Sequence, residues 1–365
     1  TDMTKARTNA SASPAVGRNM VINGAMNVSQ RGTTTGTGGV GGTAAHYPTL
    51  DRWQIEASGA GRATMSQTAD GPNGISANCI KLDCTTADAD IASAEYFIIE
   101  HNLEGQNLQR IGKGVAGAKQ VTISFYVKAS ASFTFALEFV EVQHGRSCSK
   151  LFDVTTDWNR IELTFPADVD DGSSPIVDDN AAGVRLFFWL HGGATFTSGT
   201  LQSGSFANQV SANRAAGIDS FFSNTANNFF ITGVQMEVGP VATEFEQEDF
   251  STTLARCQRY LCTVEKGITG IATTTSAINF QYSYPVTMRA VPAIAQSVNA
   301  VRVGDMVDTG TQLTSTSTTA SSHRSLDSGV WAVSGTVADN NLTPRRTVLL
   351  EPDGSDATFV FDAEL

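Results

Sequence analysis

A series of short strand-like segments, separated by clusters of Gly, Asp, Asn and Ser, constrains the fold of this chain most. Nine such segments lie between residues 51 and 238, namely DRWQIEAS, GRATMSQT, CIKLDC, EYFIIEHN, QVTISFYVKAS, FTFALEFVEVQ, WNRIELTF, GVRLFFWL and FFITGVQMEV. Several alternate with a period of two, so that Val121, Ile123, Phe125 and Val127 share one face of their segment. Strand patterns at this density, with no helical periodicity between them, predict an antiparallel sandwich. A two-sheet jelly roll is the expected architecture.

Composition narrows the class of protein. The chain has 365 residues, 41% of them hydrophobic and only 16% charged, which suits a turn-rich β-protein of two or three domains. Its net charge of −12 argues against binding to nucleic acid or to anionic membranes, because such binding needs clustered Lys and Arg. No run approaches the roughly 20 apolar residues of a membrane span, so no membrane insertion is expected. Sugars remain compatible ligands, since hydroxyl hydrogen bonds and ring stacking recognise them.

The cysteines indicate a chain without disulfides. Cys79, Cys84, Cys148, Cys257 and Cys262 have no metal-ligand spacing, and their number is odd. We expect free thiols buried as small apolar side chains, in a protein made in a reducing cytoplasm.

The chain divides into four expected parts. Residues 1–17 are small and polar and form an N-terminal arm, and residues 18–245 form the jelly roll. Residues 246–263 form a connecting helix, and residues 264–365 form a smaller C-terminal β-domain. The predicted fold class is therefore all-β: an antiparallel jelly-roll sandwich followed by a short helix and a smaller C-terminal β-domain.

Three local structures are also expected. Residues 18–31 contain a short strand interrupted by the turn or bulge signal Asn23-Gly24. The Gly/Thr-rich run 32–43 is a flexible surface loop, and it lacks the Lys-Ser/Thr ending of a phosphate-binding loop. The helix places Phe250, Leu254, Cys257 and Leu261 on one face.

Candidate binding residues are aromatic side chains with polar neighbours. A sugar site needs an exposed planar ring beside hydroxyl-binding groups, and Tyr47, Tyr126, Trp158 and Trp189 are the candidates. Core packing is the competing interpretation for Trp189, which ends a continuous apolar run, and capping of the sandwich is the competing interpretation for Trp158.

The sequence predicts no catalytic residues, no metal and no cofactor, because no nucleophile elbow, HExxH, CxxC or nucleotide motif occurs. An acidic cluster offers oxygens that suit calcium but lacks EF-hand spacing, so a solvated loop is the preferred interpretation. Its members are Asp168, Asp170, Asp171, Asp178 and Asp179.

Six motifs in order carry a family resemblance. They are RNMVINGAMNVSQRG, TLDRWQ, EHNLEGQNL, AKQVTISFYVKAS, FFITGVQMEVGPVATEFE and LARCQRYL, between residues 18 and 261. The chain resembles phage and prophage tail proteins of the tail-fibre type, which carry a carbohydrate-binding-like jelly-roll domain. No single motif is specific, but six in the same arrangement are.

The resemblance implies a virion protein, made in the host cytoplasm, that attaches non-covalently to host surface glycans. It implies a homotrimeric tail fibre or receptor-binding component whose N-terminal arm docks on other virion proteins of the tail or capsid, and it implies no enzyme activity. A second hypothesis is a capsid decoration or head-fibre protein that stabilises the shell. A third is a glycan-degrading tail enzyme, whose paired carboxylates would meet only in the fold.

Overall fold

The computed structural model describes residues 17–35, 39–169, 175–264, 268–280, 282–296, 301–305, 312–320, 333–337, 342–352 and 359–365. The chain forms two compact units, Thr1–Thr253 and Leu254–Leu365. Apart from residue 17, the expected N-terminal arm lies outside the described residues, and the four-part division made from the sequence stays a prediction.

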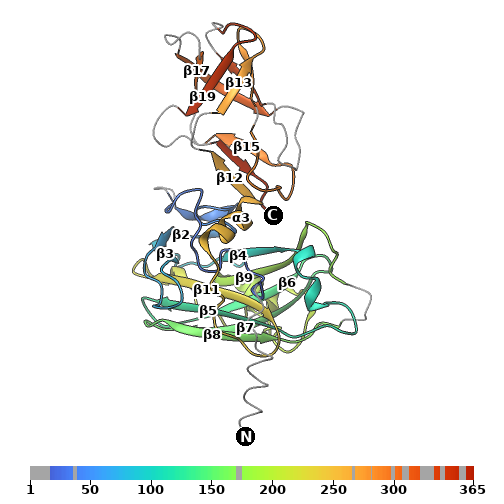
Figure 1. Ribbon diagram of the computed structural model, residues 1–365. Helices are drawn as coiled ribbons and strands as arrows, with labels where there is room; N and C mark the ends of the chain where they lie inside the picture. Colours follow the sequence, from blue (N-terminus) through green and yellow to red (C-terminus); the bar gives the residue numbers. More distant parts are fainter. Residues whose placement is uncertain are drawn as a thin grey trace. The chain divides into compact units, whose positions relative to one another are not determined.

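The first unit is one antiparallel sheet of eleven strands (Figure 1). Ten of them follow the order β10-β7-β6-β9-β4-β2-β3-β11-β5-β8, and β1 pairs with β2. The strands are β1 (Val40–His46), β2 (Trp53–Thr68), β3 (Cys79–Thr86), β4 (Tyr96–Glu104), β5 (Val121–Ala129), β6 (Phe133–Glu141), β7 (Arg146–Val154), β8 (Asn159–Phe165), β9 (Ala182–Gly192), β10 (Ala207–Asn208) and β11 (Asn228–Val238).

A bend in the long strand β2 turns this sheet into a sandwich. Residues 53–59 of β2 pair with β4, whereas residues 62–68 pair with β3. The register shifts at Ser58/Gly59 and again at Arg62/Ala63, and Gly59 has a φ of 68°. Bulges of this kind bend a strand and increase its twist. The segments DRWQIEAS and GRATMSQT, which the sequence analysis separates, are therefore one strand that serves both layers.

Aromatic side chains fill the space between the layers. The Phe125 ring of β5 lies 5.0 Å from the Phe152 ring of β7 and 5.2 Å from the Phe188 ring of β9. Phe135 of β6 and Phe229 of β11 meet at 5.6 Å. All four residues expected to share one face of β5 belong to this core, namely Val121, Ile123, Phe125 and Val127. The predicted all-β sandwich fold is confirmed.

The N-terminal motif packs beside β11, but it is not the strand that the sequence suggested. Asn23 and Met26 have positive φ angles of 58° and 57°, which break an extended conformation into turns. The segment is nonetheless fixed to β11, since Met20 N donates to Met236 O at 2.9 Å and Val234 N donates to Gly24 O at 3.0 Å.

Contacts between residues 17–19 and 244–246 continue this attachment. The Glu246 carboxylate accepts hydrogen bonds from the backbone N–H groups of Gly17 at 2.6 Å and Asn19 at 2.7 Å. The Arg18 guanidinium donates to Glu244 O at 3.0 Å. Residues more than 220 positions apart thus lie side by side in the first unit.

Two further local expectations were wrong. The Gly/Thr-rich run 32–43 is not wholly a loop, because its residues from Val40 onward belong to β1. Asp168 of the acidic cluster is not solvated: it is buried and accepts hydrogen bonds from the Arg146 guanidinium at 2.8 and 3.1 Å. Asp170 and Asp171 lie outside the described residues.

Helices are few and short in the described part of the chain. Helix α3 covers Phe250–Gln258, and α2 covers Ala194–Thr197. The expected apolar face of α3 is incomplete, because Phe250 is 56% exposed and Leu261 already belongs to strand β12. The one-turn helices η1 (Gly105–Asn107), η2 (Gln109–Ile111), η3 (Ser211–Asn213) and η4 (Phe221–Ser223) lie in loops of the first unit. No helix among the described residues is long and apolar enough to span a membrane.

The second unit is also antiparallel β-structure. A three-stranded sheet has the order β12-β20-β15, and six further strands close into a barrel in the order β13-β14-β18-β17-β16-β19. Its strands are β12 (Leu261–Val264), β13 (Ile268–Ala272), β14 (Ala277–Phe280), β15 (Ala293–Gln296), β16 (Val301–Asp305), β17 (Gln312–Ala320), β18 (Val333–Val337), β19 (Thr347–Pro352) and β20 (Phe359–Asp362). The expected smaller C-terminal β-structure is present.

All five cysteines are buried free thiols, as predicted. Burial raises the pKa of Cys79 and of Cys148 to about 11. Both thiols are therefore neutral at physiological pH.

Candidate functional site

The outer face of strands β2, β4, β9 and β6 carries an unusual mixture of apolar and charged side chains. In the register of these strands Ile98 lies opposite Trp189, and Trp189 lies opposite Ala136. One step along, Glu100 faces Phe187, which in turn faces Glu138. Alternate residues of β9 enter the main core, whereas Phe187 and Trp189 belong to a second, smaller apolar cluster. The outer face of these strands is therefore partly covered by the side chains of this second cluster.

A cleft of about 390 Å³ opens on this face. Its walls come from strands β2, β4, β6 and β9 and from the segments around α2 and β10. The lining residues are Glu56, Tyr96, Ile98, Val140, Val142, Gly145, Arg185, Phe187, Trp189, Phe196, Gln209 and Arg214. The volume lies at the lower end of the range for small-molecule sites.

Trp189 and Arg214 form the floor of the cleft. Trp189 is fully buried, and its indole Nε1 donates to Glu138 Oε2 at 2.9 Å. The Arg214 guanidinium lies 4.8 Å from the Trp189 ring centre and donates from Nε to both Glu138 oxygens, at 2.9 and 3.1 Å. Because Glu138 is itself fully buried, the three side chains hold one another in a fixed arrangement.

Two aromatic rings of the cleft remain partly exposed. The rings of Tyr96 and Phe196 meet edge to face at 5.4 Å. The Tyr96 hydroxyl donates to Glu56 Oε1 at 3.2 Å. Burial raises the pKa of Tyr96, and the negative charge of Glu56 raises it further. The phenol therefore stays protonated and can act as a hydrogen-bond donor.

Glu100 adds a titratable group beside these rings. It is 2% exposed, and its Oε1 lies 3.5 Å from Arg185 Nε. Burial raises the pKa of Glu100 to about 7, the positive charge of Arg185 opposes this rise, and the nearby carboxylate of Glu56 adds to it.

The four candidate residues from the sequence fall into two pairs. Trp189 is the buried floor of the cleft, and Tyr47 lies on the same side of the sandwich, where its hydroxyl accepts from Asn102 Nδ2 at 3.3 Å. Tyr126 and Trp158 belong to the other layer, near β5 and β8. Trp158 Nε1 donates to Asp70 O at 3.1 Å, and Lys128 Nζ lies 5.2 Å from the Trp158 ring centre. The four do not converge on one site.

The half-exposed rings of the cleft escaped the sequence analysis. Tyr96 begins the strand YFIIEHNLE, where a signal was available: Tyr96, Ile98 and Glu100 alternate with Phe97 and Ile99. Phe196 and Arg214 lie outside regular strands, so no periodicity marks them. Their approach to the sheet depends on contacts made only in the folded chain.

Solved structures similar to this chain include sugar-binding modules. A CBM4 structure has 12% identity and a TM-score of 0.29, covering 60% of this chain and 99% of that chain. The family 11 carbohydrate-binding module of the cellulosomal cellulase Lic26A-Cel5E of Clostridium thermocellum has 14% identity and a TM-score of 0.27, covering 54% of this chain and 96% of that chain.

A phage protein is among the similar structures as well. The enzymatically active domain of bacteriophage CBA120 tailspike protein 4 has 12% identity and a TM-score of 0.28, covering 52% of this chain but only 19% of that chain. No family model matches the sequence, and no curated protein matches it. At TM-scores below 0.3, these likenesses do not indicate a function for this chain.

Proposed function

We propose that this chain is a structural virion protein of a bacteriophage, a tail-fibre or receptor-binding component that binds host surface glycans non-covalently through the cleft on β2, β4, β9 and β6. The observation that carries the glycan part is the pair of half-exposed rings, Tyr96 and Phe196, above a floor fixed by Glu138. Flat apolar rings suit the faces of sugars, and Glu56, Arg185 and Gln209 offer groups for their hydroxyls. The virion part rests on the six ordered motifs of residues 18–261.

The lining of the cleft favours binding over hydrolysis. Glycosidases hold two carboxyl groups about 5–10 Å apart, on either side of the scissile bond. Of the described residues that line the cleft, Glu56 is the one that carries a carboxylate. A single lining carboxylate supports an attachment role without catalysis.

Glycan binding is tested with an array of bacterial surface glycans, followed by calorimetry on any glycan that binds. Tyr96→Ala and Phe196→Ala should each weaken binding about tenfold, because each removes one of the two partly exposed rings. Tyr126→Ala, on the other layer of the sandwich, is the matched control and should bind as the wild type does. Equal affinities for all four proteins would refute the cleft as the glycan site.

The virion role needs separate measurements. Antibody labelling of particles that carry this protein should decorate the tail, and labelling confined to the head would favour the capsid decoration hypothesis. Incubation with host polysaccharide should release no reducing ends, whereas release would favour the enzyme hypothesis. The trimer predicted from the resemblance is checked by light scattering of the purified chain.

A further inference from the structure

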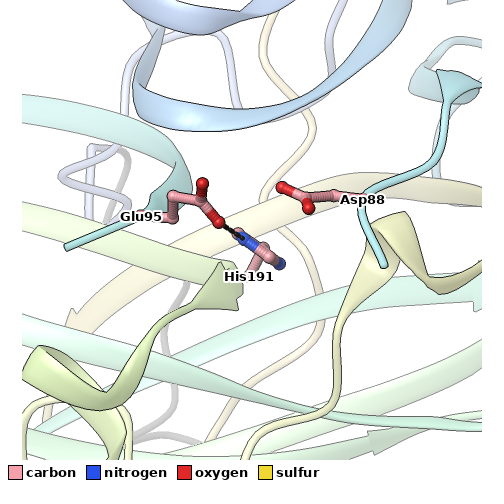
Figure 2. A group of neighbouring side chains, drawn as sticks. All are labelled: Asp88, Glu95 and His191. Atoms are coloured by element: carbon pink, nitrogen blue, oxygen red, sulfur yellow. Dashed lines mark ion pairs between the residues drawn. The ribbon is translucent and has the colours of Figure 1, made fainter. Parts of the chain in front are cut away.

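A second cluster of polar side chains lies at one end of the sandwich. It combines Asp88, just after β3, with Glu95, just before β4, and His191, near the end of β9. One ligand atom from each residue lies within 4.8 Å of the other two. Figure 2 shows the two carboxylates turned toward the imidazole from separate elements.

The imidazole is the least accessible member of the cluster. His191 is 0% exposed, and its buried Nε2 has no hydrogen-bond partner among the residues that the structure describes. Glu95 Oε2 lies 3.9 Å from this nitrogen, beyond hydrogen-bond reach. A buried ring nitrogen without a partner is unfavourable, so its direction toward two carboxylates requires an explanation.

The other ring nitrogen is already fixed. Nδ1 of His191 pairs with Ser220 Oγ at 2.8 Å, and Ser220 Oγ also accepts from Phe222 N at 3.2 Å. With the proton on Nδ1, the lone pair of Nε2 points toward the carboxylates. Histidine ligands of metals are held in this way, by a hydrogen bond from the second nitrogen. Burial also lowers the pKa of His191, which keeps the ring neutral.

Backbone contacts hold the segments that carry the carboxylates, and Glu95 Oε2 itself accepts a hydrogen bond from Ala92 N at 2.7 Å. Gly193 N donates to Glu95 O at 2.8 Å, which ties the segment before β4 to the end of β9. Asp88 N donates to Phe222 O at 2.8 Å, beside the Ser220 contact. Within the described part of the chain, neither carboxylate forms an ion pair with Lys or Arg. The two carboxyl groups thus lie together with no Lys or Arg from the described residues paired to them.

We propose that Asp88, Glu95 and His191 form a binding site for one divalent transition-metal ion, with zinc as the best match. An imidazole nitrogen and two carboxylate oxygens are good ligands for zinc, whereas calcium takes six to eight oxygens. Tetrahedral zinc places its ligand atoms about 3.3 Å apart, so ligand atoms that lie within 4.8 Å of one another must close in by at most about 1.5 Å. The fourth position would be filled by water. The ion would join three segments at one end of the sandwich independently of any glycan.

The test uses the full chain stripped of metal with EDTA. Equilibrium dialysis against zinc, with metal analysis, should give one zinc per chain, and thermal unfolding should shift to higher temperature as zinc is added. Cobalt should bind without the thiolate charge-transfer band that a cysteine ligand produces. Calcium should leave the unfolding temperature unchanged.

Isosteric variants locate the site. Asp88→Asn and Glu95→Gln should abolish the zinc-dependent shift, while Asp90→Asn, an exposed neighbour, should retain it. Ser220→Ala should weaken zinc binding by about 10–100-fold, through loss of the fixed ring. Without metal, Asp88→Asn and Glu95→Gln should unfold at or above the wild-type temperature, since each removes one of two adjacent charges.

Three results would overturn the proposal. They are equal zinc binding by the wild type and Asp88→Asn, a thiolate band with cobalt, and no zinc binding at all.

Discussion

At the scale of single residues, Glu100 makes the stability of the protein depend on pH. Its folded pKa of about 7 lies above the ordinary value of 4.5. Between these values the folded chain holds a proton that the unfolded chain releases, so the free energy of unfolding falls as the pH rises through this window. The contribution is fully present below about pH 4.5 and is lost above about pH 7.

Glu100→Gln should remove this dependence. Relative to the wild type, the free energy of unfolding of Glu100→Gln should rise by on the order of 2–3 kcal/mol as the pH goes from about 4 to about 8. Urea unfolding across this range measures it. Glu162→Gln, an exposed position on the other layer, serves as control, and a Glu100→Gln profile parallel to the wild type would contradict the raised pKa.

Trp189 shows what the sequence can and cannot reveal about a single side chain. The run VRLFFWLHG is apolar on both faces of β9 because a second apolar cluster covers its outer face. Sequence reasoning rightly suspects burial from such a run. It cannot find Arg214 and Phe196, which come from later segments and cover the ring.

At the scale of elements, the bend in β2 decides how the two layers meet. Gly61 lies in this bend, where a Cβ would come within 2.4 Å of the Thr86 carbonyl oxygen and 2.7 Å of the Phe222 ring. A backbone oxygen cannot rotate away as a flexible side chain can. The packing of the two layers at this bend therefore requires a residue without a Cβ at position 61.

Gly61→Ala should lower the free energy of unfolding by about 1–3 kcal/mol, the usual effect of overpacking. Chemical denaturation measures this loss. Gly117→Ala is the matched control, because its added methyl group meets nothing within 4 Å. Equal stabilities for the two variants would show that the bend tolerates a side chain.

Element prediction succeeded where periodicity was regular and failed where glycine or polar residues interrupted it. The alternation of β5 predicted its core face correctly. Strand β7, RSCSKLFDV, was missed because polar residues occupy much of its length. The glycines of β2 resemble turn signals, although here they permit a bend within one strand.

At the scale of the whole first unit, Asn19 connects the N-terminal motif to β11. Its side-chain oxygen accepts from the backbone N–H groups of Val21 and Met236, both at 3.0 Å, and its Nδ2 donates to Val234 O at 3.1 Å. Asn19 is 8% exposed, so water cannot easily replace these bonds. Both segments are among the six motifs of the sequence analysis, but the sequence alone did not reveal this side-chain link.

Asn19→Ala should lower the free energy of unfolding by about 2–4 kcal/mol, because it leaves buried backbone groups without partners. Thermal or urea unfolding measures the change. Asn224→Ala removes only one exposed local hydrogen bond, to Ala226 N, and should change stability by less than about 0.5 kcal/mol. Comparable losses in both variants would contradict a special role for Asn19.

The contact between residues 17–19 and 244–246 also has a mechanical consequence. The chain enters and leaves the sandwich at neighbouring points, joined by the Glu246 carboxylate and by the Arg18 bond to Glu244 O. A pulling force applied to the chain at these two points would load those hydrogen bonds first and would leave the eleven-stranded sheet outside the line of tension. The sandwich would stay folded under pull for as long as this short connection held.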